Sequence, residues 1–452
     1  MQAADTSATT TLANQKPSFR EAFFFWLKLG FISFGGPAGQ IGIMHAFVVD
    51  QKKWVSDSRF LHALNYCMLL PGPEAQQLAT YIGWLLHGVR GGLTAGILFV
   101  LPSVFILLAL SIVYVTYGSI PWVAALFYGL KPAVVAIVAL ALIKIGKKAL
   151  VNWLHYVLAL LSFVLIFFLD VPFPLIILGA IVVAVLMLKV FPAALQRRGG
   201  EEQKITDESG YYINAATVLP DTVFSWKRVS KQLAVAALLW VIPFLLFYLL
   251  LQDSSFWSNL SLFFTKAALV TFGGAYAVLP YVAQVAVEKL NWLNNYQMID
   301  GLALGETTPG PLIMVLAFVG FMAGYNHFAG SLLMGTIGLA VTTYYTFLPC
   351  FLFILVGAPI VERTQSNTSI KAILSIVTAA VVGVILNLTV YFGQAVVLRK
   401  GAGALAIDYF SLGWIVVSIL AMYRLKVGMI PWIAVSALAG LVMYLLGYFQ
   451  PI

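Results

Sequence analysis

The sequence predicts an all-α polytopic membrane protein made of two homologous six-segment halves in inverted topology, with broken or re-entrant helices. Three observations carry this prediction: the composition, an internal duplication, and one apolar segment between the halves that has no counterpart. The chain is 61% hydrophobic and only 10% charged, whereas a soluble domain is nearer half apolar and a quarter charged. Apolar runs of about 20 residues, the length that a helix needs to cross a bilayer, recur from residue 23 onward.

The first half is expected at residues 19–192. It is preceded by residues 1–18, which are mostly polar and lack the apolar core of a cleavable signal, so we expect a cytoplasmic tail there. The apolar segments of this half lie at roughly 23–49, 59–88, 92–117, 121–143, 151–169 and 172–191.

A polar linker follows at 193–230, and its mixed charges are typical of a solvated cytoplasmic segment. The apolar segment 231–252 has no counterpart in the first half. The second half is expected at 253–452, with apolar segments at roughly 258–287, 296–325, 328–357, 370–397, 408–423 and 428–449.

The two halves repeat one motif. Phe-Gly-Gly, tryptophan and Pro-Gly-Pro occur at 34–36, 54 and 71–73, and again at 272–274, 292 and 309–311, each 238 positions later. Between Lys28 and Pro73, ten of 46 positions are identical to their counterparts. The match resumes at a displacement of 247, where Leu101 and Pro102 align with Leu348 and Pro349. A register held over this length indicates an internal duplication.

The unpaired segment decides the relative orientation of the halves. Six segments in each half would leave both copies facing the same way, and one extra crossing at 231–252 turns the second copy over. Many secondary transporters are built from such inverted repeats. Most basic loops then lie in the cytoplasm if the N-terminus is inside and the C-terminus outside, with Arg399 and Lys400 as the exception.

Loop 50–58 favours helices that enter the membrane and return. A full crossing by residues 23–49 would place Lys52 and Lys53 outside, against the distribution of positive charge. Glycine and proline in the middle of segments 23–49 and 59–88 interrupt a helix there. The alternative is a pair of kinked helices that span the bilayer fully, and both alternatives keep the halves inverted.

The broken helices are expected to create an anion site. A helix interrupted inside a membrane leaves backbone groups that protein, water or a ligand must satisfy, and the free N–H groups of a new helix attract anions. The glycines that would supply such ends are Gly35, Gly36, Gly72, Gly273, Gly274 and Gly310. The alternative interpretation is close helix packing through small residues.

Lys28 and Lys266 are equivalent lysines within apolar segments, 238 positions apart. An intramembrane lysine costs roughly 2.5–3.5 kcal/mol on insertion scales. We expect the two ammonium groups to meet near the pseudo-two-fold axis and to bind a divalent tetrahedral oxyanion. The alternatives are that each lysine reaches toward an interface or pairs with a carboxylate. Lys131, whose counterpart is Thr378, is a weaker candidate.

Two carboxylates adjoin the Pro-Gly-Pro motifs. Glu74 follows the first motif directly, and Glu306 precedes the second by three residues. They are predicted to balance the lysine charges or to carry a coupling proton, although a helix-start residue that complements a dipole is an equal alternative. Thr307 and Thr308 are expected to add neutral hydrogen bonds to the oxyanion.

Other classes of function are disfavoured. The five histidines form no H-E-x-x-H pattern, and no glycine-rich loop resembles a phosphate-binding loop, so we expect no metal, no cofactor and no enzymatic activity. Cys67 and Cys350 lie in apolar stretches and are expected to be packing residues. The net charge of +9 is expected from cytoplasmic loops rather than from nucleic-acid binding.

At these motifs the chain resembles the chromate transporter family in its long, two-domain form. The family's F-G-G-P stretch corresponds to Phe34-Gly35-Gly36-Pro37, and its P-G-P stretch to Pro71-Gly72-Pro73. Degenerate copies stand at 272–275 and 309–311, where Ala275 replaces the proline. The similarity covers nearly the whole chain after residue 19.

The resemblance implies a secondary transporter that exports chromate across the bacterial inner membrane and confers chromate resistance, driven by the membrane potential or an ion gradient. An alternative is transport of sulfate or another tetrahedral oxyanion, because charge and shape barely separate the two dianions. An intramembrane enzyme is a remote alternative. The lipid bilayer and the small oxyanion are the expected partners.

Overall fold

The computed structural model describes residues 16–68, 70–190, 208–214, 217, 225–272, 274–361, 368–400 and 405–448. Apart from a short antiparallel pair, β1 (Leu398–Lys400) and β2 (Leu405–Ile407), the named elements of this part are helical. Six of the described helices are long and apolar enough to cross a membrane. The predicted class, an all-α polytopic membrane protein, is confirmed.

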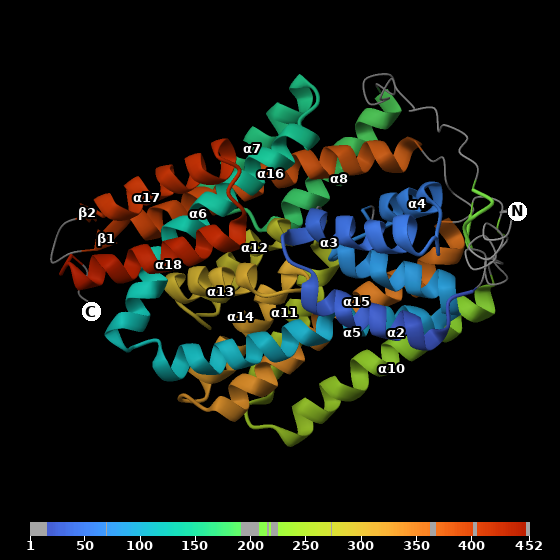
Figure 1. Ribbon diagram of the computed structural model, residues 1–452, viewed down its shortest axis with the longest axis horizontal. Coiled ribbons are helices and arrows are strands. Elements are labelled where there is room, and N and C mark those ends of the chain that lie inside the picture. The colour runs from blue at the N-terminus through green and yellow to red at the C-terminus, as the bar shows by residue number, and fades with distance from the viewer. Residues whose placement is uncertain are drawn as a thin grey trace, which may run out of the picture.

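The elements of the two halves correspond in order (Figure 1). In the first half they are α2 (Phe19–Ile32), α3 (Gly36–His45) with the π-helical turn η1 (Ala46–Gln51), α4 (Asp57–Cys67), α5 (Glu74–Tyr117), α6 (Pro121–Ala149), α7 (Trp153–Leu169) and α8 (Phe173–Val190). The second half contains α11 (Ser254–Val270), α12 (Ala275–Ala283) with η3 (Gln284–Lys289), α13 (Asn295–Thr307), η4 (Leu312–Met314) with α14 (Val315–His327), α15 (Leu332–Val361), α16 (Thr368–Val397), α17 (Tyr409–Ile419) with η5 (Leu420–Arg424) and α18 (Met429–Leu445). The unpaired helix is α10 (Trp226–Leu250).

The short helices of the first half form two hairpins. In the first, the rings of Phe25 and Phe47 stack with centroids 3.8 Å apart, and Lys52 Nζ lies 2.7 Å from Glu21 Oε1. Both ends of this hairpin therefore lie together, as a segment that enters and returns requires. The second hairpin is α4 with the start of α5, which has non-helical backbone angles at His87 and Gly88.

The open ends of both hairpins lie on one side of the molecule. His87 Nε2 lies 2.9 Å from the Pro17 carbonyl oxygen, and the His45 ring contacts Phe60 at the start of α4. We call this end, marked by Glu21, Lys52 and His87, side A.

The second half repeats the two hairpins. His327 Nε2, at the end of α14, lies 2.7 Å from Asp253 Oδ2 at the start of α11, and Phe256 contacts Trp292 in the loop between α12 and α13. We call the end marked by Asp253, Trp292 and His327 side B. From His87 at side A, α5 continues for about 40 Å, at 1.5 Å per residue, to Tyr114, which contacts Phe318 in α14.

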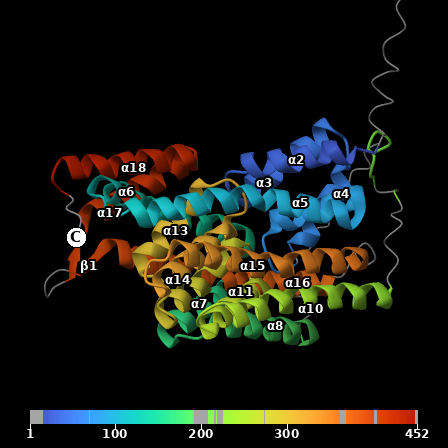
Figure 2. The same cartoon turned by 90° about the horizontal axis from the view of Figure 1, so that it is seen from below.

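The remaining helices form a second body. The hairpins, α5, α10, α14 and α15 pack together and form what we call the core body. Helices α6, α7, α8, α16, α17 and α18 form what we call the flanking body, in which α6 packs on α16, α17 and α18 from the other half. Figure 2 shows α2, α4 and the start of α5 at one end of the molecule and α17, α18 and β1 at the other.

Part of the linker differs from the solvated segment that its charges predicted. The Ile213 amide donates to the Trp54 carbonyl (3.0 Å), and the Ser56 amide donates to the Ile213 carbonyl (2.8 Å). The buried Arg59 guanidinium donates to the carbonyls of Asn214 and Thr217. The backbone bonds attach residues 208–214 to the loop between the first two hairpins, and the Arg59 side chain attaches Asn214 and Thr217 to α4. The other linker residues, 191–207, 215–216 and 218–224, lie outside the described residues.

Candidate anion site

The tips of the four hairpins meet in the interior through two equivalent hydrogen bonds. The Gly72 amide donates to the Thr271 carbonyl, and the Gly310 amide donates to the Ser33 carbonyl, each at 2.8 Å. Gly310 is the counterpart of Gly72, and Thr271 is the counterpart of Ser33. Each half therefore gives and receives the same bond, as a two-fold relation between the halves predicts.

The close approach of these tips requires glycine. Gly72 and Gly310 have φ of 126° and 97°, which side chains rarely adopt. A methyl group on Gly310 would overlap the Ser103 hydroxyl, and one on Gly72 would lie 2.8 Å from the Cys350 sulfur. Ser103 and Cys350 are again counterparts, at the displacement of 247. The predicted packing role of Cys350 agrees with this contact.

Four helices begin at the tips without a side-chain cap. They are α3, after Gly35; α12, after Gly274; α5, after Pro73; and η4, after Pro311. Gly36 begins α3 and has a φ of 69°. Because no side chain caps these ends, first-turn N–H groups are available to an anion, apart from those of Ala277 and Met314, which donate to the Gly274 and Pro311 carbonyls. Gly273 lies outside the described residues.

Both predicted carboxylates lie beside the start of α12. A Cβ on Gly274 would stand 3.9 Å from Glu74 Oε1, and the Tyr276 hydroxyl donates to Glu306 Oε1 at 2.6 Å. Glu306 is only 4% exposed. The sequence singled out Glu74 and Glu306 by their position beside the Pro-Gly-Pro motifs, but it did not single out Tyr276, whose counterpart is Ala38.

Buried polar side chains line the tips. Gln40 Nε2 donates to the Gly310 carbonyl at 2.5 Å, and Ser103 Oγ donates to the Pro309 carbonyl at 2.6 Å. Thr307 and Thr308 donate to carbonyls of their own helix, Leu304 and Gly305. In the described part of the chain, Ser33 Oγ and the Gln40 and Gln77 side-chain oxygens are buried without a hydrogen-bond partner in the protein.

The two lysines are not at the tips, which corrects the expectation that they meet near the axis. Lys28 and Lys266 are exposed on the outer faces of α2 and α11. The buried stripe of α2 is formed by Ala22, Phe25, Trp26 and Leu29, and residue 28 falls outside it. Their position instead suits the alternative in which each ammonium extends toward an interface. The helical periodicity of this stripe would have predicted that the Lys28 side chain points away from the protein interior.

A different cation lies inside the protein. Lys131 Nζ is 3.6 Å from Asp300 Oδ1, and the Tyr114 hydroxyl donates to Asp300 Oδ2 at 3.0 Å. The side chains of Lys131 and Asp300 are 19% and 5% exposed. This group joins α6, α13 and α5. The sequence analysis did not identify Asp300, because its counterpart in the first half is His62 and the two side chains are not alike.

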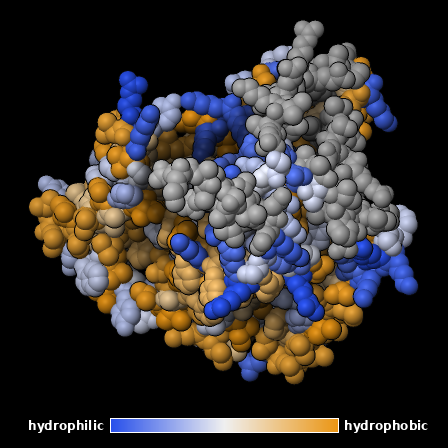
Figure 3. Space-filling view, turned by 45° about the vertical axis from the view of Figure 1, so that its right-hand side comes forward, coloured by the Kyte–Doolittle hydropathy of each residue, from blue (hydrophilic) through white to orange (hydrophobic). Residues whose placement is uncertain are grey.

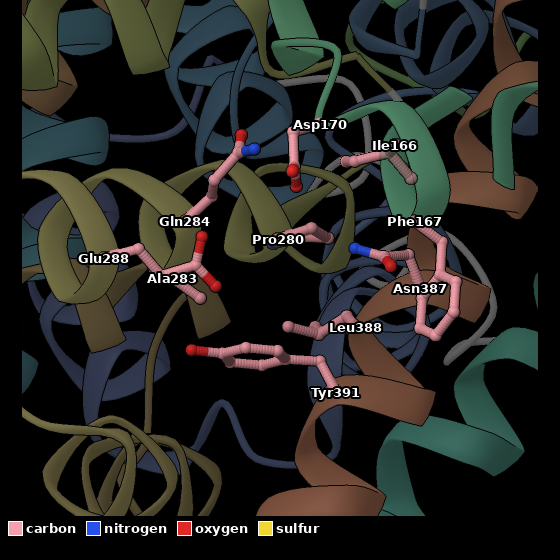
Figure 4. A pocket seen from close by; sticks show the side chains of 10 residues that line it. All are labelled: Ile166, Phe167, Asp170, Pro280, Ala283, Gln284, Glu288, Asn387, Leu388 and Tyr391. Carbon is pink, nitrogen blue, oxygen red and sulfur yellow. The ribbon is translucent and has the colours of Figure 1, made fainter. Parts of the chain in front are cut away.

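A polar cavity of about 170 Å³ lies between the two bodies, lined by residues of α7, η3 and α16 (Figure 4). Its polar side chains come from both halves: Asp170 after α7, Gln284 and Glu288 in η3, and Asn387 and Tyr391 in α16.

Figure 3 shows another face, turned toward the end that carries α4 and the start of α10, where hydrophilic side chains gather and part of the surface is recessed. Within the described residues, no group of His, Cys, Asp and Glu is arranged to hold a metal ion.

Comparisons with known proteins cover both halves. A family model described as chromate transporter matches residues 20–185 and 258–441. A chromate transport protein of Cupriavidus metallidurans is 29% identical over 98% of both chains. One of Pseudomonas aeruginosa is 30% identical over 96% of this chain and 95% of its own.

A shorter relative, an uncharacterised transporter of Bacillus subtilis, is 26% identical over 33% of this chain and 75% of its own length. No solved structure gives a significant match.

Proposed function

Since the chain belongs to the chromate transporter family, we propose that it is a secondary transporter that exports chromate across the bacterial inner membrane and so confers chromate resistance. The observation that carries the proposal is the convergence of four uncapped helix starts at the paired tips, joined by the two bonds of Gly72 and Gly310. Inverted-repeat transporters bind their substrates at such discontinuous helices near the middle of the bilayer.

The same contacts support an inverted repeat. The hairpins of the first half open at side A and those of the second half at side B, and the tips exchange equivalent bonds. This topology needs one extra crossing between the two halves, and α10, which has no counterpart, provides it. The basic ends of α6 and α8, Lys147, Lys148 and Lys189, favour side A as the cytoplasmic side. The N-terminus is then cytoplasmic and the C-terminus outside.

In this proposal a tetrahedral dianion binds the first-turn N–H groups of α3, α5, α12 and η4, and Gly35, Gly36, Gly72, Gly274 and Gly310 allow its close approach. Thr307 and Thr308 turn toward the anion when it binds and replace their present carbonyl partners. Lys28 and Lys266 add positive charge from the periphery rather than by contact.

Glu74 and Glu306 give the proposal its coupling. A dianion beside two ionised carboxylates would be repelled, and a proton on either carboxylate lowers that repulsion by removing one of the two charges. The Tyr276 hydroxyl orients the Glu306 carboxylate toward the start of α12. The proton and chromate would then leave together with a net negative charge, so the inside-negative membrane potential rather than ATP would drive export.

Everted membrane vesicles test substrate and direction together. Vesicles that contain the protein should accumulate radiolabelled chromate when respiration establishes a proton gradient, and a protonophore should abolish the accumulation. Vesicles without the protein are the control. No accumulation above this control would refute the proposal, and stronger inhibition by sulfate than by unlabelled chromate at equal concentration would make sulfate the substrate.

A further inference from the structure

The two halves contact the flanking body unequally. In the second half, α12 packs on α16 and α13 packs on α6. Their counterparts in the first half, α3 and α4, make at most isolated contacts with α6 and α16 in the described part of the chain. The core body is therefore held against the flanking body at side B, where α12 and α13 open, and not at side A.

Exposure of equivalent residues shows the same difference. Leu61 in α4 is 44% exposed, whereas its counterpart Ile299 in α13 is fully buried. Asn65 is exposed, whereas its counterpart Ala303 is 1% exposed. In an alternating-access cycle, the contacts between the two bodies are made first at one side and then at the other. The two halves of this chain differ in the same way. In this structure the two bodies are therefore in contact at side B, and within the described residues they lack the equivalent contacts at side A.

Specific polar contacts hold side B closed. The Tyr391 hydroxyl in α16 donates to Asn295 Oδ1 at the start of α13. Glu288, at the end of η3, lines the same cavity as Tyr391 (Figure 4). Lys131 and Asp300 join α6 to α13 deeper in the protein.

The counterparts of the side-B residues carry opposite charges at side A. Tyr391 corresponds to Lys144, Asn295 to Asp57 and Glu288 to Asp50. In this structure Asp57 Oδ1 lies 2.7 Å from His45 Nε2, Asp50 Oδ2 lies 3.4 Å from His45 Nδ1, and both aspartates are more than half exposed. Lys144 is exposed and, among the described residues, takes part in no ion pair.

We propose that Lys144 pairs with Asp57 and Asp50 in the alternate state, in which side A is closed and side B is open. By the symmetry of the repeat, this ion pair at side A is the equivalent of the Tyr391–Asn295 hydrogen bond at side B. The neutral hydrogen bond of the present state is lost when the ion pair forms. The three residues are positioning residues, since none touches the anion. The inference rests on the proposed function, because only a transporter needs the second state.

The pair also accounts for the exposed charges of this state. The loop that carries Asp50 and Asp57 and the helix that carries Lys144 have opposite charges, so closure at side A would bring the charges together and exclude water from them. His45 holds the two aspartates in place until Lys144 reaches them.

Paired cysteines test the contact without reference to transport. In a background with Cys67→Ala and Cys350→Ser, which gives residue 350 the side chain of its counterpart Ser103, Asp57→Cys is combined with Lys144→Cys in the full chain. In proteoliposomes this pair should cross-link with a short bifunctional reagent while the protein cycles with chromate. The matched control is Asn295→Cys with Tyr391→Cys, which touch in this structure and should cross-link without substrate. Cross-linking of the control pair alone would overturn the inference, and so would failure of both pairs.

Charge exchange provides a second readout. Asp57→Lys and Lys144→Asp should each lower the transport rate about tenfold, and the double exchange should restore it to within about threefold. A double exchange no better than either single change would overturn the inference. Loss of chromate transport in the unmodified protein, with the Asp57–Lys144 cross-link still formed, would instead refute the proposed function and leave the contact standing.

Discussion

Replacing Gly310 with alanine probes the packing of the hairpin tips directly. Gly310 has a φ of 97°, and an added methyl group would overlap Ser103 Oγ, with Ser103 Cβ 3.1 Å away. A left-handed backbone costs a residue with a side chain about 1–2 kcal/mol. Overpacking a tight interior costs about 1–3 kcal/mol more. We expect Gly310→Ala to lower the free energy of unfolding by about 2–5 kcal/mol.

Two variants separate the parts of this cost. Gly447 also has a positive φ, 76°, but nothing lies within 4 Å of an added methyl group, so Gly447→Ala should lose only the backbone part. Adding Ser103→Ala to Gly310→Ala removes the overlapping oxygen and should restore part of the loss. Gly72→Ala is expected to be milder than Gly310→Ala, because a Cβ there would meet the flexible end of Gln77 at 2.7 Å and the Cys350 sulfur at 2.8 Å.

Thermal unfolding of the purified variants in detergent, together with chromate uptake into everted vesicles, measures these effects. Gly310→Ala should be the least stable variant of the four and should lose most of its transport at a temperature where it remains folded. Equal stability of Gly310→Ala and Gly447→Ala would refute the close contact of the tips.

Three further predictions concern charge and topology. Glu306→Gln should uncouple chromate export from proton flux. Tyr276→Phe leaves Glu306 Oε1 without its donor at 2.6 Å and should only slow export. Unchanged coupling in both Glu306→Gln and Glu74→Gln would refute the role of the carboxylates. Lys28→Ala and Lys266→Ala should change the KM for chromate by less than about threefold, roughly 0.6 kcal/mol, because both side chains are exposed on outer faces; complete loss of transport with normal insertion would restore them as ligands. Single cysteines in loop 50–58 should react with an impermeant reagent from the cytoplasm and those in 288–295 from outside, and the reverse pattern would contradict the re-entrant hairpins.

The sequence predicted the arrangement of the helices better than the direction of their side chains. Glycine and proline at 34–37 and 71–73 interrupt helices wherever they stand in an apolar segment, so the breaks were visible without a structure. The charges of loop 50–58 then distinguished a hairpin from a full crossing. The Lys52–Glu21 ion pair of the structure agrees with that interpretation.

The site was only partly predictable, because contacts between the halves are not encoded in either half alone. Lys28 and Lys266 are equivalent positions whose apolar neighbours predict burial, but both lie off the buried stripe of their helix. Tyr276 and Asp300 have no chemically similar counterpart in the first half. A comparison of the two halves therefore identifies the glycines but not these two residues. The attachment of residues 208–214 to the first loop depends on backbone hydrogen bonds, which a mixed-charge sequence does not reveal.

Counterflow in proteoliposomes tests the central claim, that this chain alone carries chromate through the site at the hairpin tips. Purified protein is reconstituted with a high internal concentration of unlabelled chromate and diluted into a trace of labelled chromate. We expect transient accumulation of label in liposomes that contain the unmodified protein and none in those that contain Gly310→Ala or no protein. Equal accumulation with and without the protein, or undiminished accumulation with Gly310→Ala, would contradict the claim.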